Sequence, residues 1–259
     1  MKTSRTTWVG ALAGSIALIA GLSACGSDSS DSSSDASVAV EDTSTGTDAP
    51  STDAPAEVTE GPLVGTFAID AAVCTDAAAV TGSYFRMVQG GGTVADGPFV
   101  ANADSSCADQ SFSPLAPGTE GLVTGSFQPQ PENPFDEGGN GLADAIAAPV
   151  KFFGVNFALS SNETDPASGA TVTAPSIVLN ADGTLSGDLS ALSVAWNGQQ
   201  FNQGSPKPDG SRPGLTTDLT GTYDAATGRF VIEWVSQIVG GPFDGFSGIW
   251  HLEGVFTAG

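Results

Sequence analysis

The best candidates for acid–base chemistry lie near the C-terminal end of the chain. His251 is the only histidine, so a hydrolase built on a serine, a histidine and a carboxylate would have to use it as the general base. Glu253 lies two positions further along a predicted strand, on the same face, where it could orient the imidazole ring. No Gly-x-Ser-x-Gly nucleophile elbow accompanies them. A structural or solvated histidine is therefore the favoured interpretation.

Two carboxylates offer a second kind of chemistry, because a pair of acids flanking a sugar linkage can hydrolyse it. Glu233 and Glu253 lie on adjacent strands of a predicted hairpin, which brings them into one neighbourhood. Both also fit as outward-facing polar residues of alternating strands, and this simpler explanation is favoured. A glycan-directed, carboxylate-dependent hydrolase remains an alternative function for the chain.

An acidic, glycine-rich segment at 135–144 is the stretch that best suggests a metal. Calcium prefers hard oxygen ligands on a flexible backbone. The candidate ligands are Asp136, Glu137, Asn140 and Asp144. Their spacing is not that of an EF-hand loop, and zinc, haem and iron–sulfur centres lack the histidines and free cysteines that they need. Calcium is therefore the only cofactor that the sequence suggests.

A long segment at 196–214 mixes aromatic and amide side chains. Aromatic faces and amides together suit contact with a carbohydrate or a peptide, and long structured loops often carry function. The candidate ligand-binding residues are Trp196, Asn197, Gln199, Phe201 and Asn202. In the alternative interpretation, which is favoured, the two aromatic residues only pin the loop to the core.

The elements that must position these residues are β-strands. Short runs of aromatic and β-branched residues, bounded by Gly, Pro, Asn or Asp, recur along the chain. The predicted strands are 63–69, 83–88, 121–128, 151–159, 176–180, 193–197, 228–239 and 247–256. Asp182-Gly183 predicts a hairpin turn, and Gly228 a left-handed loop position.

The predicted fold class is all-β, with one domain over residues 61–259. Alternation places Phe230, Ile232 and Trp234 on one face of their strand, and the last strand alternates in the same way. The segment 141–147 is at most a short turn of helix. An antiparallel sandwich and a closed barrel, either with long loops, both remain open.

The first residues are typical of a secretory signal, with Lys2 and Arg5 ahead of an apolar run that is too short to span a bilayer. The run ends in Leu22-Ser23-Ala24-Cys25, which resembles the lipobox of bacterial lipoproteins. This resemblance implies removal of residues 1–24 and lipidation of Cys25, which would anchor the protein at the extracytoplasmic face of the cell membrane. Residues 25–60 are rich in Ser, Asp, Thr and Pro, a composition that predicts a disordered tether.

The net charge and the cysteines limit the classes of binding partner and the cell compartment that the sequence is compatible with. The formal net charge is −22, which argues against nucleic-acid binding and against adsorption to anionic headgroups. With Cys25 lipidated, Cys74 and Cys107 form the obvious disulfide pair, as expected in an oxidising compartment. A membrane contact through the lipid is therefore expected, but not a nucleic-acid partner.

Two further segments, 195–214 and 236–254, resemble parts of secreted actinobacterial proteins of unknown function. The resemblance implies a secreted β protein and transfers no catalytic or binding residue. The leading expectation is a lipid-anchored binding module whose partner is a wall glycan, an envelope protein or a small ligand. The hydrolase above and a carrier of apolar cargo in a β cavity are the alternatives.

Overall fold

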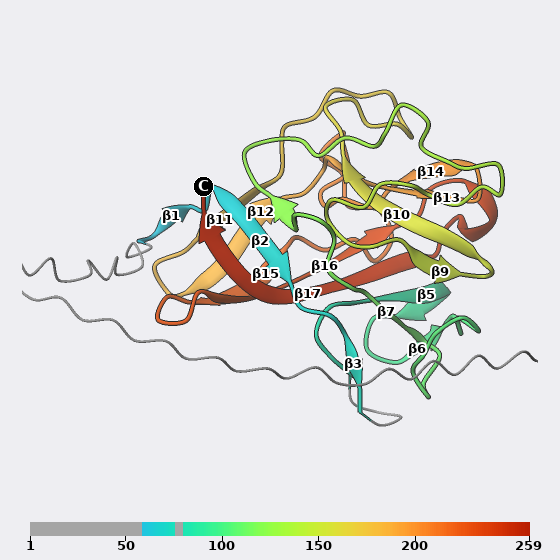
Figure 1. The fold of residues 1–259 in the computed structure, drawn as a ribbon, viewed down its shortest axis with the longest axis horizontal. Helices are drawn as coiled ribbons and strands as arrows, with labels where there is room; N and C mark the ends of the chain where they lie inside the picture. The colour runs from blue at the N-terminus through green and yellow to red at the C-terminus, as the bar shows by residue number, and fades with distance from the viewer. Residues whose placement is uncertain (1–58, 76–79) are drawn as a thin grey trace, which may run out of the picture. The chain divides into compact units, whose positions relative to one another are not determined.

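The fold is seen in a computed structural model, which describes residues 59–75 and 80–259. These residues are organised by β-strands and contain one single-turn 3₁₀ helix, η1 (Gly241–Phe243), and no α-helix (Figure 1). The predicted all-β class is therefore confirmed. The segment 141–147, the one helical candidate, forms only two isolated bridges, at Gly141 and Ala147, and a bend between them. None of the described residues belongs to a helix long and apolar enough to cross a bilayer.

The described residues form seventeen strands, most of them short. Their bounds are β1 Gly61–Pro62, β2 Gly65–Ile69, β3 Val73–Cys74, β4 Val80–Thr81, β5 Tyr84–Thr93, β6 Gly97–Phe99, β7 Phe112–Pro114, β8 Leu122–Val123, β9 Val150–Phe152, β10 Val155–Ser161, β11 Ser176–Leu179, β12 Thr184–Asp188, β13 Leu192–Trp196, β14 Gln199–Asn202, β15 Thr220–Asp224, β16 Arg229–Gln237 and β17 Ser247–Ala258.

A large antiparallel sheet is built around β17. Its main order is β1-β11-β12-β15-β16-β17-β2-β8, and β5 pairs with β17, β6 and β7. One edge of β17 pairs with β16 from Ser247 to Val255, whereas the other pairs first with β5 and then with β2. The sheet curls but does not close, because β1 and β8 end the main order without pairing with each other (Figure 1).

A smaller sheet, in the order β14-β13-β10-β9, covers the concave face of the large one (Figure 1). Aromatic contacts join the two sheets: the ring centroid of Phe157 lies 5.5 Å from that of Phe85 and 6.1 Å from that of Trp250. The two layers share one hydrophobic core. The arrangement corresponds to the sandwich alternative, with one sheet curled.

Alternation along the longest strands creates this core, as the sequence predicts. In β17, Trp250, Leu252 and Phe256 are buried, whereas His251 and Glu253 between them face outward and are partly exposed. Phe230, Ile232 and Trp234 of β16 are likewise buried at about 1% exposure or less. The register places Trp234 opposite Trp250, and their rings stack with centroids 5.8 Å apart.

Two local predictions were wrong. The single strand expected at 151–159 is the β9–β10 hairpin, which turns at Phe153 and Gly154. Residues 199–202, expected inside a long loop, form β14 and pair with β13 through a two-residue turn at Asn197 and Gly198. In both places two strands that are adjacent in the chain pair across a two-residue turn, and alternation alone does not reveal where that turn falls.

Cys74 and Cys107 are joined by a disulfide, which confirms their predicted pairing and fits a protein outside the reducing cytoplasm. The bond ties β3 to the segment between β6 and β7. The predicted signal peptide, the lipidation site Cys25 and the tether up to residue 58 lie outside the described residues.

Candidate functional site

The acid–base candidates do meet, on the outer face of the large sheet. The register places His251 beside Glu233, with Nδ1 of the imidazole 2.7 Å from Oε1 of Glu233. On the other side, Nε2 lies 3.6 Å from Oε2 of Glu253. The ring of Tyr84, the register neighbour on β5, stacks on the imidazole with centroids 4.7 Å apart.

In this arrangement each ring nitrogen of His251 is paired with a carboxylate. Burial alone would lower the pKa of His251, but the hydrogen bonds and charges of Glu233 and Glu253 outweigh it and raise the pKa above its ordinary value. The hydrogen bond from His251 in turn lowers the pKa of Glu233. Both ring nitrogens face acids, and none of the described hydrogen bonds joins His251 to a serine or a cysteine. The cluster therefore has the geometry of a surface ion network, with the imidazole lying between the two carboxylates.

Two of the predicted calcium ligands, Asp136 and Asn140, are hydrogen-bonded to each other and to nearby backbone N–H groups. Both carboxylate oxygens of Asp136 accept hydrogen bonds from Gly138 and Asn140, including one from the Asn140 side chain at 2.8 Å. Oδ1 of Asn140 accepts the backbone N–H of Asn156. Over the described part of the chain, no three His, Cys, Asp or Glu side chains gather to hold a metal, so Asp136, Glu137 and Asp144 do not form such a group. Calcium binding stays a prediction.

The predicted binding loop does not form an exposed aromatic shelf. Trp196 and Phe201 are only 8% and 7% exposed, because β13 and β14 direct them between the sheets. Asn202 is also buried, whereas Asn197 and Gln199 remain exposed at the turn. The amides and the aromatic rings are thus separated, and the two rings contribute to a different site.

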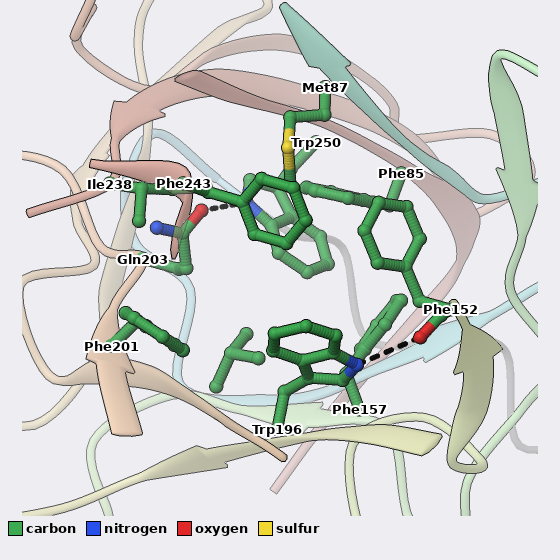
Figure 2. A pocket seen from close by; sticks show the side chains of 11 residues that line it. Phe85, Met87, Phe152, Phe157, Trp196, Phe201, Gln203, Ile238, Phe243 and Trp250 are labelled. Atoms are coloured by element: carbon green, nitrogen blue, oxygen red, sulfur yellow. Dashed lines mark hydrogen bonds between the residues drawn. The ribbon is translucent and has the colours of Figure 1, made fainter. Parts of the chain in front are cut away.

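That site is an apolar pocket between the two sheets (Figure 2). Figure 2 shows side chains from both sheets directed at one hollow, with the ring of Phe243 from η1 on one side of it. Its lining residues are Phe85, Met87, Phe152, Phe157, Val194, Trp196, Phe201, Gln203, Ile238, Phe243 and Trp250. The cavity has a volume of about 40 Å³, and its walls present no polar surface.

Hydrogen bonds fix the polar edges of the pocket's walls. Nε1 of Trp196 donates to the carbonyl oxygen of Phe152 at 2.9 Å, and Nε1 of Trp250 donates to Oε1 of Gln203 at 3.2 Å (Figure 2). The amide nitrogen of Gln203 donates in turn to the carbonyl oxygen of Asn202. These polar groups are satisfied within the protein, so the cavity itself offers a ligand only apolar contacts.

Sequence reasoning identified only two residues of this pocket as binding candidates, Trp196 and Phe201. The face of Trp250, shared with Leu252 and Phe256, followed from alternation, but the convergence of Phe85, Phe152 and Phe243 with it depends on how two sheets stack. The usable signal was the concentration of aromatic residues at inward positions of several strands.

A buried polar network lies beside Asn202. The Lys207 side chain is 6% exposed, and its ammonium donates to Oγ of Ser236 at 2.7 Å and to the carbonyl oxygen of Asn202 at 2.9 Å. The Asn202 amide donates to Asp165, which is fully buried. Burial lowers the pKa of Lys207 to about 8, against the opposing charges of Asp165 and Asp209. The Lys207 amine is buried and already hydrogen-bonded to Asn202 and Ser236. The network therefore links β14 to β16 and does not present a reactive group.

Comparison with known proteins adds no assignment. No protein-family description matches the chain, and neither a curated protein nor a solved structure is significantly similar to it. The resemblance of 195–214 and 236–254 to secreted actinobacterial proteins stays a prediction. The geometry of the chain's own residues is therefore what carries a functional proposal.

Proposed function

We propose that the protein is a lipid-anchored, extracytoplasmic binding module that holds the apolar part of a small ligand in the pocket between its two sheets. The observation that carries the proposal is the aromatic cavity itself, with walls that are already hydrogen-bonded in place. Concave, largely preformed apolar cavities are the usual form of small-molecule sites. Each Å² of apolar ligand surface buried there contributes about 25 cal/mol.

The other candidate functions receive less support. A wall glycan would need exposed aromatic faces, and Trp196 and Phe201 are buried. A carboxylate hydrolase would need two acids free to face a substrate, and Glu233 and Glu253 flank an imidazole instead. The carrier of apolar cargo, one of the alternatives raised by the sequence, fits the pocket best.

Apolar probes test the site directly. We expect toluene and 1-hexanol to change the fluorescence of Trp196 and Trp250, which form part of its walls. Val194→Phe adds a ring inside the cavity and should weaken binding at least about tenfold. Val255→Phe adds the same ring on the outer face, where Val255 is 39% exposed, and should bind as the wild type does. Equal binding by both variants, or none by the wild type, would refute the proposal.

The anchor is tested separately, on the full precursor in cells. Lipidation of Cys25 predicts that the wild-type protein partitions into the detergent phase, since two or more acyl chains give stable membrane retention. Cys25→Ala should release the protein into the medium or leave it uncleaved. Unchanged detergent partitioning of this variant would contradict lipidation.

A further inference from the structure

The turn that follows Phe152, which lines the pocket, carries an unusual residue. The β9–β10 hairpin turns through Phe153 at φ 51° and Gly154 at φ 81°. The β13–β14 hairpin has the same two-residue turn at Asn197, φ 50°, and Gly198, φ 70°. Turns that need two positive φ values favour Asn-Gly, and a bulky side chain in the left-handed region is strained. One hairpin therefore has the favoured residue, and the other has an aromatic one at the same position.

Core packing does not account for Phe153. Its side chain is 49% exposed, one of the few large hydrophobic residues exposed over the described part of the chain. Its ring centroid lies 4.9 Å from that of Phe152 and 5.8 Å from that of Phe243. The residue thus combines a strained backbone with an exposed aromatic ring, and both features are unfavourable for stability.

Its neighbours explain its position. Phe152 and Phe243 both line the pocket, and their centroids are 5.9 Å apart. Phe153 contacts both of them from the solvent side. An apolar track of ring contacts therefore runs from Phe85 through Phe152 to the exposed ring of Phe153, with Phe243 in contact with the last two.

The shape of this track limits the ligand. The cavity, at about 40 Å³, has room for roughly three atoms of the size of a water molecule. The cavity therefore takes in only one end of a ligand, such as the methyl group of toluene or the end of an alkyl chain, and the rest of the ligand must continue outward past Phe243. The absence of polar wall surface requires the enclosed part to be hydrocarbon, and the net charge of −22 disfavours an anionic end group.

We infer that the pocket and Phe153 together form one elongated site for the linear alkyl chain of an amphiphile that is not anionic. The chain end lies in the cavity, the following methylenes lie against Phe153, and the polar end stays in solvent. This inference rests on the proposed apolar pocket and assigns its ligand class and a residue that selects for chain length.

A homologous series of neutral amphiphiles tests it. We expect the affinity of the full mature protein for 1-alkanols, measured by tryptophan fluorescence from 1-pentanol to 1-decanol, to rise about fourfold per methylene while the chain is being covered. Toluene, which is compact, should not gain from Phe153. An affinity that stops rising at 1-pentanol would contradict an elongated site.

Two reciprocal variants separate a binding role from a structural one. Phe153→Asn places the favoured residue in the turn, so it should raise the melting temperature by about 2–4 °C. The same variant should bind 1-decanol about tenfold more weakly than the wild type and bind toluene equally well. Asn197→Phe creates the strained turn at the other hairpin, so it should lower the melting temperature by a similar amount and leave both affinities unchanged.

The outcomes of these experiments test the role of Phe153 separately from the proposed binding function of the pocket. If the wild type binds neither toluene nor any alkanol, the pocket is not a binding site and both proposals fail. If Val194→Phe blocks binding but Phe153→Asn retains wild-type affinity for 1-decanol, the pocket stands and the role of Phe153 is refuted. Weaker 1-decanol binding together with a higher melting temperature supports the inference, because a purely structural role would not produce that combination.

Discussion

Between pH 8 and pH 10 we expect the free energy of unfolding to rise by about 2–3 kcal/mol because of Lys207. Burial lowers the pKa of this amine to about 8 in the folded protein, whereas in the unfolded chain it titrates near its model value of 10.5. In this window the unfolded state therefore binds more protons than the folded state, and stability increases with pH. Below pH 8 both states are protonated, and the gain is absent.

Urea unfolding at a series of pH values measures this effect. Lys207→Met removes the titrating group and should abolish the rise, whereas Lys151→Met, at a lysine whose side chain is 59% exposed, should retain it. Burial raises the pKa of Tyr84 and of Tyr223, which act with the opposite sign from about pH 10 upward, so the comparison ends there. A rise of equal size in Lys207→Met would show that other groups cause it.

Loss of the Cys74–Cys107 disulfide is expected to lower the free energy of unfolding by about 3–4 kcal/mol. The bond closes a loop with a sequence separation of 33, and opening that loop enlarges the unfolded ensemble. The Cys74→Ser/Cys107→Ser double variant and the wild type under reducing conditions should show the same loss. The double variant itself should not respond to a reductant, since Cys25 is not part of the bond.

Mass spectrometry of a non-reduced digest should recover the two half-cystines in one linked peptide pair. Free thiols at both positions, or a wild type whose urea midpoint does not change on reduction, would contradict a stabilising disulfide.

The local sequence pattern was sufficient to predict the structure where every second residue of a strand is buried. Alternation in 228–239 and 247–256 predicted the buried faces of β16 and β17, including Trp234 and Trp250, because each strand has one face on the core. The cysteine pairing followed from chemistry and compartment, with no geometry needed. The fold class could therefore be predicted from the sequence.

The site could be predicted only in part, because its formation depends on contacts between distant segments. Phe153 looks like a strand residue, and although Gly154 next to it permits a turn, the first position of such a turn normally carries asparagine. Gln199 and Gln200 are neither β-branched nor aromatic, the types enriched in strands, yet they join a sheet by pairing with β13 across the turn at Asn197 and Gly198. Trp196 and Phe201 were identified as binding candidates, but the stacking of two sheets directs them inward.

The position of β17 has a consequence for biogenesis. Its C-terminal half pairs with β2, so that Ala258 lies opposite Gly65, and its N-terminal half pairs with β5. During synthesis β2, β5 and β16 all wait for a partner strand that emerges after them. Contacts of such long sequence separation form late and slowly. The large sheet therefore stays incomplete until β17 has been made, which suits passage of the unfolded chain through a narrow translocation channel before the sheet assembles on the far side.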